Sequence, residues 1–325
     1  MMSHVEIRKP GWQTTIQDAG RWGRQGYGVS VSGPMDWFSH RLANARVGNS
    51  GEAAALEVTM SGPELVFEGE AWFAVTGAEF PLHLNGAPVA IARPMRARSG
   101  DTLSFGLRRR GARGYLAVAG GFSVPPVLGS RSTHVLSGLG GLEGRPLRAG
   151  DRIEIGESSG TPSRAAALAT PSESVEREAH LRSAVLTLPA GGATVRVLPG
   201  PHEDRFSRET IDKLYSSRYV LSSRSDRMGY RLDGPALPWS AETAELISSA
   251  TVAGAIQIPA SGQPILLMAD RATTGGYPIL AVVISADLPL AGQLGPGDWI
   301  EVEPCTRDEA LAALREREDA LTSAF

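Results

Sequence analysis

Four short stretches of this 325-residue chain combine charged side chains with glycine. They are "TIQDAGRWGRQGYGVSVSGPMD" (15–36), "LPGPHEDRF" (198–206), "SSRSDRMGYRLDG" (222–234) and "ADRATTGGYPILAVV" (269–283). Glycine lets backbone N–H groups approach a ligand closely, and an arginine guanidinium donates two parallel hydrogen bonds to an oxyanion. The chemistry that these stretches favour is therefore the binding of an anion or an amide group.

Each stretch also has a plain structural interpretation. The arginines of 222–234 are compatible with a solvated strand face, and "TTGGY" (273–277) is compatible with a hairpin turn. Asp270 fits an ion pair at a strand end, and His202 fits a polar surface turn as well as proton transfer. Taken singly, each stretch favours the structural interpretation, and the structural and the functional interpretations both remain open.

Signatures of several enzyme classes are absent from the sequence. The chain contains no G-x-x-x-x-G-K-[ST], G-x-S-x-G or H-E-x-x-H motif. "GLGGLEG" (138–144) lacks the strand–turn–helix setting of a dinucleotide loop and is predicted to be a flexible loop. The six histidines have no metal-ligand spacing and there is a single cysteine, so neither a metal site nor an internal disulfide is predicted.

Composition narrows the class of partner. A net charge of −3 gives no basic surface field, so no nucleic-acid partner is expected. No apolar run reaches about 18 residues, which argues against a membrane partner. The first residues, "MMSHVEIRKPGW", lack the apolar segment of a signal peptide, so a cytoplasmic location is predicted.

Short strands and tight turns must position the charged stretches, because 38 glycines and 22 prolines punctuate the chain. Many segments alternate apolar and polar residues, as half-buried strands do. Three sequence echoes occur in the same order in both halves, which predicts two copies of one β-rich unit. The echoing pairs are 5–11 with 194–200, 99–121 with 261–283, and 147–157 with 294–304.

The predicted domains follow from these echoes. They are a first domain at 1–155, a linker at 156–184 that is rich in Ser, Ala, Thr and Pro, a second domain at 185–305 and a C-terminal helix at 306–325. Helix starts are predicted at Asp36, at Ser207 and at the capping box from Thr306 to Glu309.

Several segments together resemble the allophanate hydrolase subunit 2 family, which includes the C subunit of prokaryotic 5-oxoprolinase, KipA and the carboxyltransferase portion of urea carboxylase. They are "GWQTTIQDAGRWGRQGYGVSVSGPMD", "LPGPHEDRF", "SDRMGYRLDG", "QPILLMADRATTGGYPILAVV" and "DLPLAGQLGPGDW", within about residues 5–304. The resemblance implies a mainly β fold of tandem cyclophilin-like β-barrel domains with a few short helices.

The same resemblance implies an activity. It points to the C subunit of a 5-oxoprolinase complex that uses ATP to open the lactam of 5-oxoproline to glutamate. The implied partners are a subunit 1 protein (the KipI-like B subunit) and a LamB/YcsF-like protein (the A subunit), with ATP bound together with or by one of these partners. The substrate would be a small amide or lactam.

Two alternative functions come from the same family. One is the carboxyltransferase component of a biotin-dependent urea or amide carboxylase. Biotin would then arrive on another chain, because this sequence has no "MKM" attachment signature. The other is a KipA-like regulatory protein that sequesters a kinase inhibitor.

The resemblance also makes the charged stretches one candidate site, since the "QDxGR" segment of the family lies at its active surface. The residues that we predict to be catalytic are Asp18, Arg21, His202 and Asp270. Those that we predict to bind substrate are Gln17, Asp36, Arg227, Arg231, Thr273, Thr274, Gly275, Gly276 and Tyr277. The first-domain loop and the "TTGGY" loop are expected to meet in one cleft lined by Arg21, Arg227 and Asp270.

Overall fold

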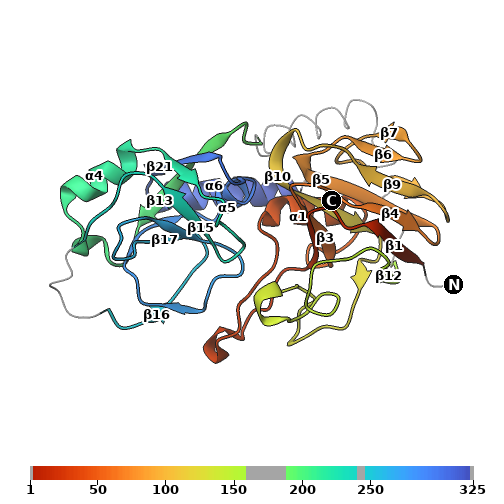
Figure 1. Ribbon diagram of the computed structural model, residues 1–325, viewed down its shortest axis with the longest axis horizontal. Coiled ribbons are helices and arrows are strands. Elements are labelled where there is room, and N and C mark those ends of the chain that lie inside the picture. The colour runs from red at the N-terminus through yellow and green to blue at the C-terminus, as the bar shows by residue number, and fades with distance from the viewer. Residues whose placement is uncertain (1–2, 159–187, 240–245, 323–325) are drawn as a thin grey trace. The chain divides into compact units, whose positions relative to one another are not determined.

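The computed structural model describes residues 3–158, 188–239 and 246–322, and the chain forms two compact units (Figure 1). Unit 1 comprises Met1–Arg21, Ser32–Leu188 and Glu316–Phe325, and unit 2 comprises Trp22–Val31 and Pro189–Arg315. Strands dominate both units, as predicted. The predicted domain boundaries remain a prediction, because the linker lies outside the described residues from residue 159 onward.

Unit 1 consists of two sheets that share one hydrophobic core. The larger sheet has the order β11 (Phe122–Ser123), β12 (Arg152–Ile155), β1 (His4–Lys9), β4 (Glu64–Phe67), β9 (Thr102–Phe105), β6 (Leu82–Leu84) and β7 (Ala87–Val89). The smaller sheet has the order β2 (Gln13–Gln17), β3 (Ala55–Thr59), β10 (Arg110–Val118), β5 (Ala71–Glu79) and β8 (Met95–Ala97). In β1, Val5 and Ile7 are fully buried while their neighbours are not, so the alternation seen in the sequence directs one face to the core.

Helix α1 (Trp37–Arg46) packs against strands of the smaller sheet. Ala43 joins Ala74, Tyr115 and Ala117 in a cluster distinct from the core between the sheets. The helix begins as predicted, because the Asp36 carboxylate accepts a hydrogen bond from the Ser39 N–H at 2.8 Å. The 3₁₀ helix η2 (Val135–Ser137) follows in the long connection between β11 and β12.

Unit 2 is built around a closed barrel. Its strand order is β13 (Gly192–Pro199), β20 (Ile279–Val283), β17 (Ala255–Gln257), β18 (Ile265–Leu267), β15 (Gly229–Asp233), β14 (Tyr219–Leu221) and β21 (Trp299–Pro304). Outside the barrel are a ribbon of β16 (Ser249–Ala250) and β19 (Thr274–Gly275), helices α4 (Arg208–Ser216) and α5 (Leu288–Gly292), and the 3₁₀ helices η1 (Gln25–Tyr27) and η3 (Glu203–Arg205). The predicted cap of α4 is present, since Ser207 Oγ accepts from the Thr210 N–H at 3.2 Å.

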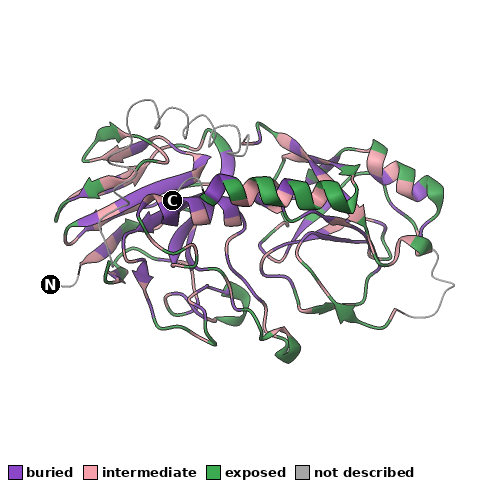
Figure 2. Cartoon of the chain, turned by 180° about the vertical axis from the view of Figure 1, so that it is seen from behind, coloured by how far each residue is buried: buried purple, intermediate pink, exposed green. Residues whose placement is uncertain are grey.

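The last helix, α6 (Arg307–Thr322), carries a long exposed face (Figure 2). Its predicted capping box forms: the Thr306 N–H donates to Glu309 Oε2 at 2.7 Å, and the Glu309 N–H donates to Thr306 Oγ1 at 3.2 Å. Near its end, Glu318 accepts a hydrogen bond from Arg41 of α1 at 2.6 Å. Across the described ranges, the structure contains no helix both long and apolar enough to cross a membrane.

The sequence echoes lie on strands in both units, but those strands pair differently. β1 pairs with β12 antiparallel, whereas their counterparts β13 and β21 pair in parallel. Alternation of apolar residues selects which face of a strand is buried, but it does not select the direction of the neighbouring strand. Superposition of the two halves therefore remains a prediction, and it must accommodate this difference.

Candidate functional site

The Asp18 carboxylate, just after β2 in unit 1, is held by a dense set of donors. It accepts hydrogen bonds from the hydroxyls of Ser130 and Ser132 and from the backbone N–H groups of Arg131 and Gly20. Burial alone raises the pKa of Asp18, but these hydrogen bonds outweigh it and hold the pKa below its ordinary value. The carboxylate thus fixes two segments to each other, and its predicted catalytic role remains a prediction.

Arg21 is the largest fully buried side chain of the described residues, with 1% of its surface exposed. Its Nε donates to the Val127 carbonyl at 2.9 Å and its Nη2 donates to the Ser132 carbonyl at 2.7 Å. Gly140 has φ of +68°, and a Cβ there would lie 2.5 Å from Nη2 of this arginine. The guanidinium therefore holds the 127–140 loop, which has room for it only because residue 140 is glycine.

The "GLGGLEG" loop is closed by its own backbone. The N–H groups of Leu139, Gly141 and Gly144 donate to the carbonyls of His134, Arg131 and Gly140 at 3.2, 2.9 and 2.8 Å. Because these amides are already bonded, they are not free to hold a phosphate group. Three N–H groups of this loop are therefore occupied, and its lack of a nucleotide-binding role remains a prediction.

Gln17 and His134 are among the buried side chains of unit 1 that have a polar atom without a hydrogen-bond partner in the described residues. Gln17 donates from Nε2 to Thr15 Oγ1 and to the Thr133 carbonyl, but its Oε1 has no partner among the described residues. His134, 7% exposed, accepts a hydrogen bond from the Ser137 N–H at Nδ1, so we assign its proton to Nε2. That Nε2 is buried and likewise has no partner within the described part of the chain. Sequence reasoning missed His134, whose only signal is its place before the glycine-rich loop.

Asp36, predicted to bind substrate, is fully buried at the start of α1. Its two carboxylate oxygens accept from the backbone N–H and the hydroxyl of Ser39 at 2.8 and 2.6 Å. These contacts describe a helix cap, and a role in binding substrate remains a prediction.

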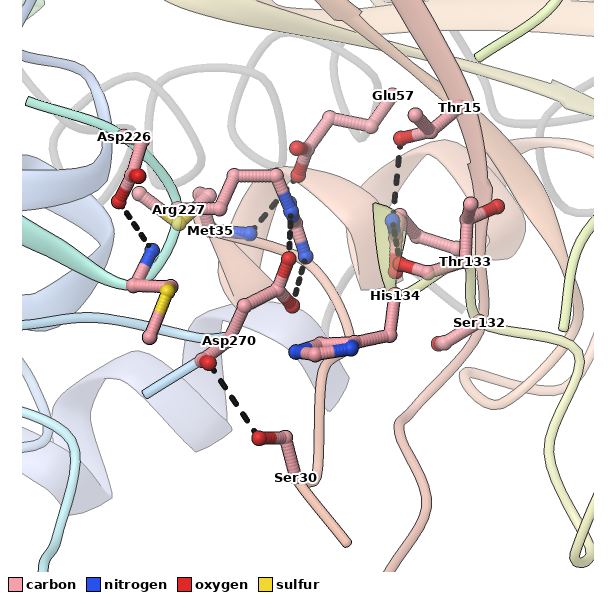
Figure 3. A network of polar contacts seen from close by, with 12 residues as sticks. Thr15, Ser30, Met35, Glu57, Ser132, Thr133, His134, Asp226, Arg227 and Asp270 are labelled. Atoms are coloured by element: carbon pink, nitrogen blue, oxygen red, sulfur yellow. Dashed lines mark hydrogen bonds and ion pairs between the residues drawn. The ribbon is translucent and has the colours of Figure 1, made fainter. Parts of the chain in front are cut away.

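In unit 2, Arg227 and Asp270 form a buried bidentate ion pair. Arg227 Nε lies 2.9 Å from Asp270 Oδ2 and Nη2 lies 3.0 Å from Oδ1, and both side chains are 6% exposed. Figure 3 shows the two groups facing each other, with Ser30 donating to the Asp270 carbonyl. The structure thus brings together two residues that the sequence analysis placed in one site, 43 positions apart.

The next residue, Arg271, is buried without a counter-charge. It is 9% exposed, and its Nε has no hydrogen-bond partner among the described residues. Among those residues it also forms no ion pair, and burial lowers the pKa of its guanidinium. The carboxylate adjacent to it, Asp270, has both oxygens occupied by Arg227. Sequence reasoning chose Asp270 and left out Arg271, although the same "ADRATTGG" stretch contains both.

A second unpartnered donor adjoins the "TTGGY" segment. Gln257 at the end of β17 is buried, and its Nε2 has no partner in the described residues. A Cβ at Gly275 would lie 2.5 Å from this nitrogen, so glycine is needed for their close approach. Thr274 and Gly275 form β19, whereas Gly276 and Tyr277 are exposed.

The other predicted residues of unit 2 lie in different settings. His202 accepts from the Ile279 N–H at Nδ1, at 3.1 Å, and burial lowers its pKa. Arg231 is exposed on β15. The Thr273 carbonyl accepts from the Thr251 N–H at 3.0 Å. The functions of these residues, and the cleft that was expected to join the first-domain loop to the "TTGGY" loop, remain predictions.

The part of the chain that the structure describes contains no group of three or more His, Cys, Asp or Glu side chains that could hold a metal ion. The arrangement that remains is one of hydrogen-bond donors and a buried cation, which suits an anionic or amide ligand.

Comparisons of the sequence and of the structure with known proteins point to the same family. The chain is 39% identical to the 5-oxoprolinase C subunit of Escherichia coli, over 97% of this chain and 95% of that protein. It is 36% identical to the 5-oxoprolinase C subunit of Haemophilus influenzae, over 94% of this chain and 93% of that protein. The crystal structure of the K. lactis urea amidolyase matches 99% of this chain with a TM-score of 0.89 and 32% identity, and the chain spans 20% of that protein's length.

These similarities confirm the resemblance found in the sequence and the mainly β fold class. Residues 27–304 match the carboxyltransferase domain, subdomain A and B. The chain belongs to this carboxyltransferase domain family.

Proposed function

We propose that this chain is the C subunit of an ATP-dependent 5-oxoprolinase complex, which opens the lactam of 5-oxoproline to glutamate. The observation that carries this proposal is the 39% identity to a 5-oxoprolinase C subunit over nearly the whole of both chains. The urea amidolyase similarity extends over a fifth of that protein, so it bears on one part of a larger enzyme.

The chemistry of the proposed reaction explains which groups are needed. A lactam is a resonance-stabilised amide that water attacks poorly, so coupling to ATP is needed to make its carbonyl carbon a better electrophile. Charge then develops on oxygen atoms, and guanidinium and N–H donors in a buried site stabilise such charge strongly. Ring opening also requires that the amide nitrogen gain a proton, which is a task for an acid held in place.

Two described residues offer donors of this kind, and each is considered within its own unit. In unit 2, the Arg271 guanidinium, whose Nε has no partner among the described residues, is available to an anionic group of the substrate outside the lactam. In unit 1, the buried Nε2–H of His134 has no partner among the described residues and is available as a hydrogen-bond donor. The Arg227–Asp270 pair positions the backbone next to Arg271.

We do not assign ATP to the glycine-rich loop of unit 1, because the N–H groups of Leu139, Gly141 and Gly144 are bonded to backbone carbonyls. We therefore assign ATP to a site formed with or by a partner protein of the complex, and no residue of this chain is assigned to it. The proposed partners are a subunit 1 protein and a LamB/YcsF-like protein, in the cytoplasm.

The test is co-expression with these partner proteins followed by an assay of ATP-dependent glutamate release from 5-oxoproline. We expect release by the assembled complex and little or none by the isolated chain. Full turnover by the isolated chain would contradict the assignment to a multi-subunit complex, and no turnover by the complex would contradict the activity.

A second candidate function is carboxyl transfer in a biotin-dependent urea or amide carboxylase. The observation that favours it is the structural match to urea amidolyase over 99% of this chain. This function requires a biotinylated carrier, so avidin should abolish turnover. Under the 5-oxoprolinase proposal, avidin should leave glutamate release unchanged.

A further inference from the structure

Arg271 combines burial with the lack of an acid partner among the described residues. Arg196 pairs with Asp287 at 2.7 Å and Arg218 pairs with Glu301 at 2.8 Å, each with more of the arginine exposed than in Arg271. Burying a charge without a counter-charge is costly, so a fold has no reason of its own to retain one. A ligand that supplies the missing negative charge would explain why Arg271 is buried without an acid partner.

The backbone of Arg271 is fixed and its neighbouring acid is engaged. Its N–H donates to the Met268 carbonyl at 3.2 Å, and its carbonyl accepts from Ser30 Oγ at 2.7 Å. Asp270 cannot neutralise it, because Arg227 occupies both carboxylate oxygens. The local structure therefore fixes the backbone at Arg271, and the adjacent carboxylate is engaged by Arg227.

We infer that Arg271 binds the carboxylate of the substrate, with the Gln257 amide as a second donor, which deepens the proposed function and rests on it. Arg271 begins the 271–275 segment, and Gln257 Nε2 lies against Gly275 at its end. A guanidinium fork fits the two oxygens of a carboxylate, and an amide N–H adds a neutral donor.

The charge of the site favours a carboxylate over a nucleotide. 5-Oxoproline carries one negative charge beside its neutral lactam, and Arg271 supplies one positive charge. The phosphates of ATP share the oxyanion chemistry but carry several negative charges, which call for several cations or a metal ion. The inference thus predicts that Arg271 distinguishes 5-oxoproline from a lactam without a carboxylate.

The experiment uses the assembled complex with wild-type chain, Arg271→Gln or Arg271→Lys. Arg208→Gln is the matched control, because Arg208 is an exposed arginine of the same unit. Turnover is measured with 5-oxoproline and with 2-pyrrolidinone, the same lactam without the carboxylate, and the KM for ATP is measured in each variant. The melting temperature establishes that each variant is folded.

We expect Arg271→Gln to lower kcat/KM for 5-oxoproline by about 100-fold, a typical cost of truncating one partner of a buried charge pair. The kcat/KM for 2-pyrrolidinone and the KM for ATP should stay at wild-type values, and Arg271→Lys should be intermediate. Equal losses with both lactams, a raised KM for ATP, or no change would each overturn the inference.

A measurement of 5-oxoproline binding tests the role of Arg271 independently of whether the complex has 5-oxoprolinase activity. Calorimetric titration of the full chain with 5-oxoproline and with inorganic phosphate needs no turnover. Binding of 5-oxoproline that Arg271→Gln abolishes and Arg208→Gln preserves supports the carboxylate site even if the complex releases no glutamate. Binding of phosphate alone, or the same 5-oxoproline binding in wild type and Arg271→Gln, contradicts the site even if the complex is active.

Discussion

Arg21 in unit 1 and Arg271 in unit 2 are both more than nine-tenths buried, but their donors are used differently. Arg21 gives two hydrogen bonds to backbone carbonyls of the 127–132 segment, at 2.9 and 2.7 Å, and only its Nη1 makes no hydrogen bond to a described residue. Arg271 has an unpartnered Nε and forms no ion pair with a described residue. The Arg21 guanidinium stabilises the structure of its loop. We infer that the Arg271 guanidinium binds an anionic ligand.

This difference shows why burial alone does not identify a ligand-binding residue. A buried charge whose donors meet fixed acceptors stabilises the fold, and its loss exposes those acceptors as unpaired groups. A buried charge without acceptors destabilises the fold until a ligand binds. The two cases predict opposite responses of stability and activity to substitution.

The largest expected effect on stability concerns the pair beside Arg271. Asp270→Ala leaves Arg227 buried without its counter-charge, next to a second unpaired guanidinium. We expect the free energy of unfolding to fall by about 3–5 kcal/mol, as measured by urea denaturation.

Asp233→Ala is the control, because Asp233 is exposed at the end of β15. The double variant Arg227→Met/Asp270→Leu should recover much of the loss, since it removes both charges. A loss below about 1 kcal/mol in Asp270→Ala would mean that the pair is not needed to neutralise Arg227.

A slightly smaller loss of stability is expected at Arg21. Arg21→Ala removes two charge-assisted hydrogen bonds and leaves the carbonyls of Val127 and Ser132 without these donors. The expected cost is about 3 kcal/mol. If the variant instead unfolds like wild type and loses only turnover, the contrast between the two arginines is wrong and Arg21 belongs to the reacting site.

Substitutions of His134 test whether its unpartnered Nε2–H in unit 1 contacts a ligand. In His134→Asn, the amide oxygen can replace Nδ1 as acceptor for the Ser137 N–H, but the Nε2–H is lost. We expect kcat of the complex to fall by roughly 100-fold if the Nε2–H donates a hydrogen bond to the reacting amide in the transition state.

His134→Gln separates proton transfer from hydrogen bonding. Its amide can place an N–H near the position of Nε2, but it is not an acid. Recovery of kcat in this variant would show that hydrogen bonding suffices, and wild-type kcat in both variants would remove His134 from the reaction.

How far the sequence predicts this molecule depends on the range of the interaction. The caps at Asp36, Ser207 and Thr306 were predictable because each involves residues three positions apart. The parallel pairing of β13 with β21 was not, because it joins segments about a hundred residues apart whose alternation permits either direction.

The candidate site shows the same limit. The "ADRATTGG" stretch predicts that charged groups gather near glycine, and Arg227 and Asp270 do meet. Which of the neighbours Asp270 and Arg271 would be left without a partner depends on a contact 43 positions away. For His134 the sequence gives only its place before the glycine-rich loop, because the unpartnered Nε2 depends on the hydrogen bond that Ser137 makes to Nδ1.

The smallest expected effect concerns Asp18 and pH. Its pKa in the folded chain is below its ordinary value, because the hydrogen bonds outweigh the effect of burial. A depressed folded pKa contributes stability that is present above the unfolded pKa of about 3.9 and is lost as the pH falls through the folded value. The stability difference between wild type and Asp18→Asn should therefore shrink as the pH falls from about 6 to about 3. A difference that stays constant over this range would contradict the stabilisation of the charged form.

The most direct test of the contrast measures melting temperature and kcat/KM for 5-oxoproline on Arg21→Gln and Arg271→Gln in the same assembled complex. If Arg21 stabilises its loop, Arg21→Gln should lower the melting temperature by roughly 5–10 °C, and the protein that remains folded should keep near-normal specific activity. If Arg271 binds the substrate carboxylate, Arg271→Gln should lower kcat/KM by about 100-fold and leave the melting temperature unchanged or higher. The opposite pattern, or equal losses of both quantities in both variants, would contradict the contrast between the two arginines.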